Sequence, residues 1–125
     1  MENIEKLSGY NEFRNYADNI KSGNVNFYFT GSKNESGVSW CPDCVEALPH
    51  VEEAFEKYQN NCTLISVDVG DRAYWKDMSN PFRLDKDIKL MVIPTLIRWK
   101  KPQRLEGDQC AKKDLLQMFF SDEED

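Results

Sequence analysis

Two cysteines three residues apart form the segment of this chain best suited to chemistry. They lie in the run Trp40-Cys41-Pro42-Asp43-Cys44. Residues at positions i and i+3 share one face of a helix, close enough for two sulfur atoms to bond. The pair can therefore exist as a dithiol or as a small-ring disulfide, and we predict a redox site.

The residues after the second cysteine predict a helix that starts at this motif. Residues 45–58 contain no glycine. Their apolar side chains recur at the spacing of one helix face: Val45, Leu48, Val51, Phe55 and Tyr58. Pro42 suits the first helical position, where its missing N–H costs nothing. Cys41 is then expected at the cap, beside unpaired backbone N–H groups and the positive end of the helix dipole.

The position of Cys41 predicts a lowered pKa for its thiol. An ordinary thiol is only a few per cent ionised at pH 7, and lowering its pKa to about 7 takes roughly 2 kcal/mol. A helix terminus contributes typically ~0.3–1 kcal/mol and at most ~2 kcal/mol. A hydrogen bond from the Cys44 thiol is the natural supplement. The carboxylate of Asp43 acts against it, because a nearby negative charge raises a thiol pKa.

The expected reaction is thiol–disulfide exchange. Cys41 is the predicted nucleophile, which attacks a substrate disulfide and forms a mixed disulfide. Cys44 is the predicted resolving residue, which attacks Cys41 and releases the reduced product. Trp40 has two interpretations that the sequence leaves open, a flat docking surface for substrate or a side chain that packs in the core.

The surrounding pattern predicts an α/β fold in which helices flank a central mixed β-sheet. The stretch from Gly70 to Lys89 is polar, with turns and one short helix expected. Pro49 is expected to bend the helix after the cysteines. The other expected elements are helices at Tyr10–Ile20 and 115–120, strands at Val25–Thr30, Thr63–Val69, Thr95–Trp99 and Gln103–Glu106, and a loop at Gly31–Ser39.

Size and charge limit the function classes. The 125 residues, 40% hydrophobic, predict one domain over residues 1–120 and an acidic tail at residues 121–125. Four of the six net negative charges belong to that tail, and no basic face for nucleic acid is expected. Neither a secretory signal nor a bilayer-spanning apolar run is recognisable, so we expect a cytoplasmic protein without membrane contact. In a reducing compartment, close cysteines indicate catalysis or metal binding.

These motifs resemble the thioredoxin superfamily, whose members carry Trp-Cys-x-x-Cys at the start of a proline-bent helix. Ile93-Pro94-Thr95 matches the family's cis-proline loop, which faces the thiols. Within the superfamily, the small thioredoxin-related proteins are most similar. The motifs that carry this closer resemblance are Phe29-Thr30-Gly31-Ser32-Lys33, Ser39 with the cysteine motif, Tyr74-Trp75-Lys76-Asp77, Pro94-Thr95-Leu96 and the acidic end.

The resemblance implies a thioredoxin-like fold and a cytosolic disulfide reductase. It implies no bound cofactor or metal, a monomeric chain, and electrons supplied from NADPH by thioredoxin reductase as partner. The implied substrates are cystine and selected protein disulfides. Pro42 and Asp43 would tune the redox potential, and Trp40, Ile93, Pro94 and Thr95 would dock the substrate. Peroxide reduction and inflammatory signalling are associated with the family, and these residues show neither.

One departure from ordinary thioredoxin concerns proton transfer. Thioredoxin has a buried aspartate in the strand before its motif, whereas Val25–Thr30 contains no carboxylate. Glu35 and Asp43 are candidate replacements as proton acceptor. The inserted loop Gly31–Ser39 is expected to lie beside the site and to restrict which substrates reach it.

Two alternatives belong to other function classes. Cys-Pro-x-Cys also opens zinc knuckles, but a closed zinc site needs four ligands. Only Cys62, Cys110 and His50 remain for that purpose, and they are scattered in the sequence. Cys62 and Cys110 are better interpreted as small, partly buried side chains. The second alternative is a non-catalytic binding or signalling protein that keeps the thioredoxin fold.

Overall fold

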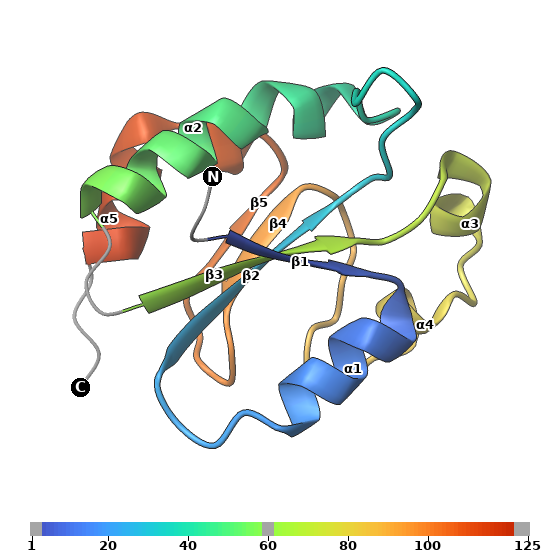
Figure 1. Ribbon diagram of the computed structural model, residues 1–125, viewed down its shortest axis with the longest axis horizontal. Coiled ribbons are helices and arrows are strands. Elements are labelled where there is room, and N and C mark those ends of the chain that lie inside the picture. The colour runs from blue at the N-terminus through green and yellow to red at the C-terminus, as the bar shows by residue number, and fades with distance from the viewer. Residues whose placement is uncertain (1–3, 59–61, 122–125) are drawn as a thin grey trace.

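The computed structural model describes residues 4–58 and 62–121. Figure 1 shows a central sheet with helices above and below it. The elements in chain order are β1 (Ile4–Ser8), α1 (Tyr10–Asp18), β2 (Asn24–Thr30), α2 (Pro42–Tyr58), β3 (Cys62–Asp68), α3 (Arg72–Lys76), α4 (Pro81–Leu84), β4 (Thr95–Arg98), β5 (Arg104–Glu106), the 3-10 helix η1 (Gly107–Ala111) and α5 (Lys113–Ser121).

The five strands form one mixed sheet in the order β1-β3-β2-β4-β5. Both β1 and β2 run parallel to β3, with Ile4 opposite Leu64 and Tyr28 opposite Ser66. The hairpin partner strands β4 and β5 are antiparallel, and β4 is also antiparallel to β2. The predicted α/β class with a mixed sheet is therefore confirmed, and its central strand β2 leads through the loop at 31–39 to the cysteine motif.

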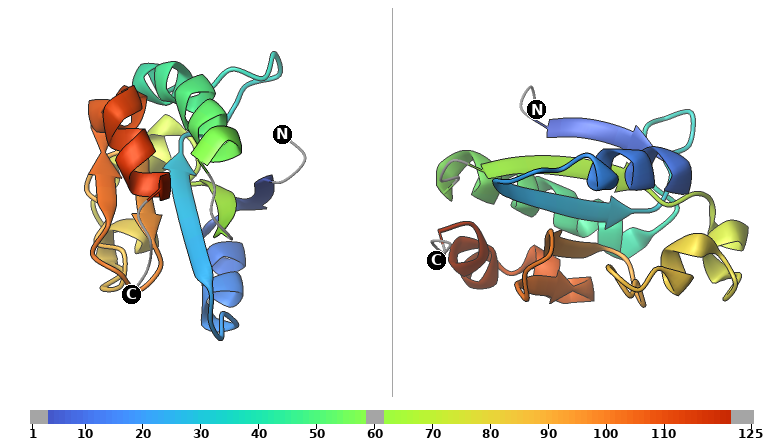
Figure 2. Two further views of the ribbon diagram at one scale, coloured as in Figure 1. Left: turned by 90° about the vertical axis from the view of Figure 1, so that its left-hand side faces the viewer. Right: turned by 90° about the horizontal axis from the view of Figure 1, so that it is seen from below.

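Each face of the sheet is covered by its own helices, as the two views in Figure 2 also show. Alternate residues of a strand point to opposite faces, so β2 serves two cores. Tyr28 packs under α2 and α5 with Phe55 and Phe120. Phe27 and Phe29 point to the other face, toward α1 and α4. There the aromatic rings meet mostly edge-on: Phe13 with Phe27, Phe29 and Trp99, and Phe29 with Phe82.

Several expected elements are corrected by the structure. The N-terminal strand β1 was not predicted. The stretch from Gly70 to Lys89 contains two short helices rather than one, each capped by a side chain: Asp71 accepts from Tyr74 N–H, and Asn80 accepts from Arg83 N–H. Pro49 lies inside α2, where it was expected, and the helix continues on both sides of it. Ser121 ends α5 instead of opening the tail, and tail residues 122–125 lie outside the described part of the chain.

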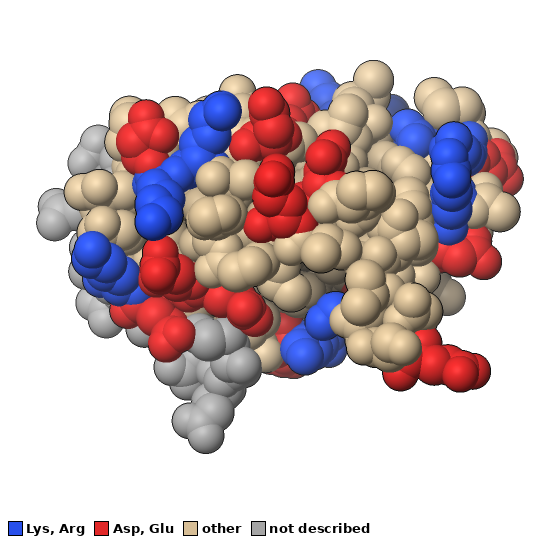
Figure 3. All heavy atoms as spheres, turned by 90° about the horizontal axis from the view of Figure 1, so that it is seen from above, with Lys and Arg blue, Asp and Glu red and all other residues tan. Residues whose placement is uncertain are grey.

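Charged side chains of both signs are mixed over the face that carries α2 and α5 (Figure 3). Acidic groups gather along that face, and the basic groups on it are separated by acidic or uncharged surface. No helix within residues 4–58 and 62–121 combines the length and the apolar character that a membrane crossing requires.

A buried carboxylate ties α1 to the segment after α4. Asp85 accepts hydrogen bonds from Tyr10 Oη at 2.7 Å and from Arg14 Nη1 at 2.8 Å. Burial by itself raises the pKa of Asp85, but these hydrogen bonds outweigh it and hold the pKa below its ordinary value of 3.8. The charged form of Asp85 thus stabilises the fold.

Asp85→Asn is expected to lower the free energy of unfolding by about 1–3 kcal/mol at pH 7, because a charge-assisted hydrogen bond is lost. A carboxyl with a lowered pKa stabilises above its ordinary pKa, and this contribution disappears as pH falls through the lowered value. Urea unfolding should therefore show the difference from wild type shrinking toward pH 3. Asp18→Asn is the matched control: Asp18 also pairs with Arg14, at 2.7 Å, but its side chain is 57% exposed, so less than ~1 kcal/mol is expected. Equal costs for both variants would contradict the assignment.

Candidate active site

The cysteine motif lies at the start of α2, as predicted. Pro42 is the first helical residue, and Cys41 precedes it. The carbonyl of Cys41 accepts from Val45 N–H at 3.1 Å, which is the first hydrogen bond of the helix. Its own N–H donates to Ser39 Oγ at 3.1 Å, and that hydroxyl donates to Gly31 O at 2.9 Å. Ser39 therefore joins the end of the inserted loop to its first residue, which follows β2, and to the helix start.

The two thiols lie together beneath the surface, unbonded to each other. Cys41 is 5% exposed and Cys44 is 1% exposed. The backbone N–H of Cys44 donates to Cys41 Sγ at 3.3 Å. The pKa of Cys41 is lowered from 9.0 to about 7, chiefly by a hydrogen bond from the Cys44 thiol. Burial and the charge of Asp43 oppose this shift without reversing it, so the expected lowering of the pKa agrees with the geometry.

The pKa of Cys44 is shifted in the opposite direction to that of Cys41. Its hydrogen bond with Cys41 and its burial raise its pKa far above the ordinary value, so it stays a thiol at neutral pH. The hydroxyl of Thr30 and the backbone N–H of Gly31 act the other way and stabilise a Cys44 thiolate. Sequence reasoning did not single out Thr30, although its place at the end of β2 could have done so. At neutral pH, Cys41 is therefore the thiolate that can attack, and Cys44 remains protonated until the second exchange.

The proline loop faces the dithiol from the opposite side of the site. The Ile93–Pro94 peptide bond is cis, and Ile93 O lies 3.9 Å from Cys41 Sγ. Thr95 was predicted to dock substrate, but it is fully buried, and its hydroxyl donates to Val92 O at 2.7 Å. Its side chain therefore supports the loop and does not reach the surface. The exposed residues beside the proline are Met91 and Val92, which sequence reasoning missed.

Trp40 is held in place by the structure and is only half-buried. Its indole N–H donates to Gly70 O at 2.9 Å, and its backbone N–H donates to Ser32 O at 3.3 Å. The ring packs against the core cluster that contains both active-site cysteines. Of the two interpretations, core packing is therefore present, and the exposed part of the ring remains available beside Cys41.

Gly31→Ala is expected to lower the free energy of unfolding by about 1–3 kcal/mol, because overpacking forces neighbours to move. A Cβ at position 31 would lie 2.8 Å from Trp40 Cε2, so the indole must shift away from Gly70 O. Urea unfolding measures the free-energy cost, and the tryptophan fluorescence that is lost in Trp40→Phe reports the displacement of the indole. In a Trp40→Phe background the same change should cost less. Equal costs in both backgrounds would mean that the clash with Trp40 is not the cause.

The inserted loop forms a folded rim next to the site. Lys33 and Ser39 pair as an isolated antiparallel bridge at its base. Within it, Asn34 Oδ1 accepts from Ser36 N–H at 2.8 Å and from Val38 N–H at 3.1 Å. Glu35, proposed above as a proton acceptor, is exposed on this loop, and Asp43 is exposed on α2. The Cys44 thiol contacts Cys41, the Thr30 hydroxyl and the backbone N–H of Gly31, and neither carboxylate is among these partners.

The remaining metal-ligating side chains lie apart. Within the described ranges, no group of three or more His, Cys, Asp or Glu side chains is placed to hold a metal ion. Cys110 is fully buried, 3.4 Å from Leu105 O, and burial raises its pKa to about 12. Cys62 is partly buried at the start of β3, and His50 is partly buried on α2.

Solved thioredoxins share this fold. Thioredoxin O1 from Arabidopsis thaliana, in its oxidised state, aligns with a TM-score of 0.60 and 22% identity over 94% of this chain and 98% of that one. Reduced Schistosoma mansoni thioredoxin aligns with a TM-score of 0.55 over 92% and 98% of the two chains. With a reactive dithiol at the helix start, the chain falls in the class of thioredoxin-fold thiol–disulfide oxidoreductases.

Sequence comparison narrows the class to one family. The family model described as thioredoxin domain-containing protein 17-like, thioredoxin domain, matches residues 6–122. Thioredoxin domain-containing protein 17 is 39% identical in Homo sapiens and 42% identical in Danio rerio, each over 94% of both chains. Thioredoxin-like protein Clot of Arabidopsis thaliana is 36% identical over 80% of this chain and 78% of its own length. The chain belongs to the thioredoxin domain-containing protein 17-like family, which confirms the resemblance to small thioredoxin-related proteins.

Proposed function

We propose that this protein is a disulfide reductase that acts on small disulfides such as cystine and on selected protein disulfides. The observation that carries the proposal is the pair of opposed pKa shifts: Cys41 near 7 and Cys44 far above its ordinary value. Roughly half of Cys41 is then thiolate at pH 7, against a few per cent for an ordinary thiol. The proposal extends to peroxide reduction: the Cys41 thiolate attacks one peroxide oxygen, the O–O bond breaks, and the other oxygen leaves as water after taking a proton. The Cys41 sulfenic acid then reacts with the Cys44 thiol, which forms the Cys41–Cys44 disulfide and releases a second water.

The reaction proceeds in two exchanges. The Cys41 thiolate attacks one substrate sulfur, the substrate S–S bond breaks, and its other sulfur leaves as a thiolate that takes a proton from solvent. Cys44 then loses its proton as Thr30 and the Gly31 N–H stabilise its charge, and it attacks Cys41 Sγ. The Cys41–Cys44 disulfide forms while the second substrate sulfur leaves. Two electrons pass to the substrate.

The surface beside Cys41 orients the substrate. Met91 and Val92, which are 63% and 41% exposed, lie next to cis-Pro94 and offer apolar contact. Ile93 O, 3.9 Å from Cys41 Sγ, directs the substrate chain toward the nucleophile. Trp40 and the rim at 31–39 bound the opening on the other side, which favours small or extended disulfides. Pro42 and Asp43 set the redox potential through the helix start and through charge next to the thiolate.

The oxidised pair must be reduced again for turnover. Our proposal assigns this step to thioredoxin reductase, which transfers two electrons from NADPH, with the chain acting as a cytoplasmic monomer that holds no cofactor. Support comes from the Cys-Pro-Asp-Cys motif in a chain of this family, because close cysteines serve catalysis in proteins of reducing compartments.

A coupled assay tests the proposal. Purified chain, thioredoxin reductase, NADPH and cystine are mixed, and NADPH consumption is followed by absorbance. The expected result is consumption that depends on both the chain and cystine, at one NADPH per cystine reduced. Failure of this chain to turn over cystine or any protein disulfide, while ordinary thioredoxin does so under the same conditions, would favour the non-catalytic binding protein.

A further inference from the structure

Ser39 connects the backbone around both sulfurs of the dithiol. Its hydroxyl accepts from Cys41 N–H at 3.1 Å and donates to Gly31 O at 2.9 Å. Gly31 is buried, and its N–H is a hydrogen-bond partner of the Cys44 sulfur, where it favours the thiolate form. One side chain therefore joins the residue that attacks the substrate to a residue that contacts the resolving thiol.

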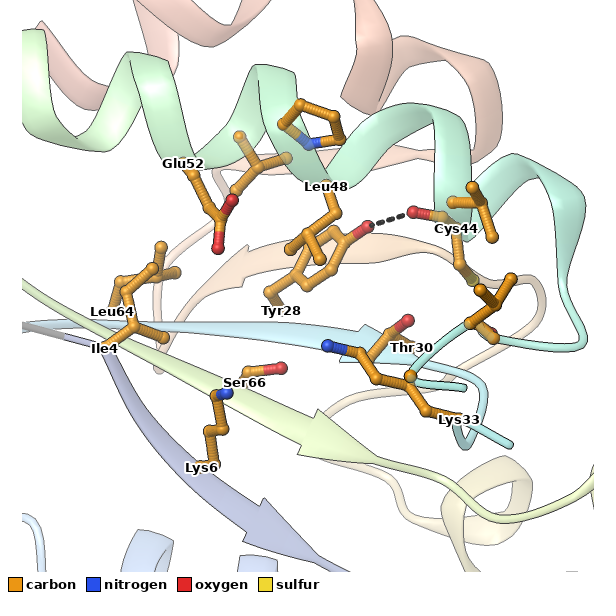
Figure 4. A pocket seen from close by; sticks show the side chains of 16 residues that line it. Ile4, Lys6, Tyr28, Thr30, Lys33, Cys44, Leu48, Glu52, Leu64 and Ser66 are labelled. Atoms are coloured by element: carbon orange, nitrogen blue, oxygen red, sulfur yellow. Dashed lines mark hydrogen bonds between the residues drawn. The ribbon is translucent and has the colours of Figure 1, made fainter. Parts of the chain in front are cut away.

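Two donors stabilise a Cys44 thiolate, and the first of them is held by the sheet. It is the hydroxyl of Thr30, the last residue of β2, whose carbonyl accepts from Val69 N–H at 2.9 Å. Figure 4 shows Thr30 and Cys44 at the same end of the pocket behind α2. It also shows the contact between Tyr28 Oη and Cys44 O, which are 3.5 Å apart. The sheet thus positions this donor and the resolving residue without help from Ser39.

The second donor, the N–H of Gly31, depends more on Ser39. A glycine backbone rotates more freely than that of any other residue. A Cβ at this position would lie 2.8 Å from the Trp40 ring, so a larger residue does not fit there. The peptide unit between Gly31 and Ser32 is held at its carbonyl by Ser39 and at its N–H by Gly70 O, at 3.0 Å. Loss of the Ser39 hydroxyl would remove the first of these two contacts.

We propose that Ser39 is a positioning residue for the second exchange, an inference that rests on the proposed reductase function. Its hydroxyl holds Gly31 so that the Gly31 N–H faces the Cys44 sulfur as this sulfur becomes an anion. The Cys44 thiol gives its proton to the buffer, the thiolate attacks Cys41 Sγ, and the bond between Cys41 and the substrate sulfur breaks. The substrate sulfur leaves with the electron pair of that bond.

The first exchange should depend little on Ser39. The hydrogen bonds that lower the pKa of Cys41 come from Cys44 and from the backbone of Asp43. Ser39 instead contacts the backbone N–H of Cys41. A defect confined to the second exchange would therefore separate the proposed role from a general loosening of the helix start.

Stopped-flow reaction with the aromatic disulfide DTNB separates the two exchanges. In a Cys62→Ser background, attack by Cys41 should release one equivalent of thionitrobenzoate, and attack by Cys44 should release a second. Cys44→Ser should stop after the first equivalent, which assigns the two phases. Ser39→Ala should leave the first phase unchanged and slow the second by about 5–30-fold, which corresponds to about 1–2 kcal/mol at 1.36 kcal/mol per factor of ten.

Matched variants show whether the hydroxyl is the cause. Ser39→Thr keeps a hydroxyl and should restore most of the rate of the second phase. Ser36→Ala, at an exposed position on the same rim, should equal the parent protein in both phases. The pH midpoint of Cys41 alkylation should stay unchanged in Ser39→Ala, whereas a loosened helix start would raise it.

Equal second phases in Ser39→Ala and its parent would overturn the role of Ser39, and so would slowing of both phases by the same factor. If Ser39→Ala and Ser39→Gly both fail to fold, Ser39 is a structural residue and the proposal is again overturned. A parent protein that releases no second equivalent would instead contradict the proposed reductase itself.

Discussion

Cys41→Ser is expected to reduce disulfide turnover to background, a loss of at least about 1000-fold. The serine hydroxyl does not ionise near neutral pH, so the attacking anion is lost. Cys44→Ser should complete the first exchange only, because the Cys41 thiolate remains but nothing releases the product. Mass spectrometry of the Cys44→Ser protein after exposure to cystine should show one added half-cystine on Cys41. In cell extract, the same variant should retain its protein substrates as mixed disulfides.

Cys62→Ser is the matched control for these two variants, because Cys62 lies at the start of β3, outside the site. It should turn over as wild type does. Substantial turnover by Cys41→Ser, or trapping that survives reducing agent, would show that the electrons take a route other than the proposed one.

The pKa of Cys41 is expected to rise from about 7 toward 9.0 in Cys44→Ala. The hydrogen bond from the Cys44 thiol is the largest cause of the lowered pKa, and alanine removes it. Since only the thiolate reacts with iodoacetamide, the rate of alkylation against pH reports the pKa directly. At pH 6.5 the rate should fall by about tenfold for each unit that the pKa rises.

Asp43→Asn should act in the opposite direction, because the Asp43 charge raises the pKa of Cys41. Its titration midpoint should lie below that of wild type. Glu46→Gln, one turn further along the exposed side of α2, serves as the control for a general loss of acidic charge. A midpoint for Cys44→Ala that equals that of wild type would mean that the helix start alone lowers the pKa.

Local sequence patterns were sufficient to predict the dithiol and the helix that begins at it. The spacing of Cys41 and Cys44, the proline at the first helical position and the apolar stripe after it define the dithiol and α2 together. Strands β2, β3 and β4 follow from β-branched and apolar runs between turns, and β5 follows from the turn at Lys100-Lys101-Pro102 after β4. The cis bond before Pro94 came only from the resemblance, because an X–Pro bond is cis in only ~5–6% of cases.

The elements that were missed depend on contacts between distant segments. Strand β1 is five residues long and is defined by its pairing with β3, about sixty residues away. Arg98 is buried in β4, where Nη2 donates to Phe119 O at 2.8 Å and Nε donates to Asn26 Oδ1 at 3.3 Å. A charged residue inside a strand core cannot be recognised until its partners are known. The N-cap residues Asp71 and Asn80 are different, because they are recognisable in the sequence and could have predicted the starts of α3 and α4.

The rim at 31–39 is anchored only at its base. The bridge between Lys33 and Ser39 and the indole contact to Gly70 O fix that base, whereas residues 35–38 at its tip are exposed. Substitutions at Glu35, Ser36 and Val38 are therefore expected to change neither the stability of the sheet nor the pKa of Cys41, whereas Gly37 has a φ of 79° that favours glycine. The tip is thus the part of the rim where the sequence can vary with the fewest structural consequences for the dithiol.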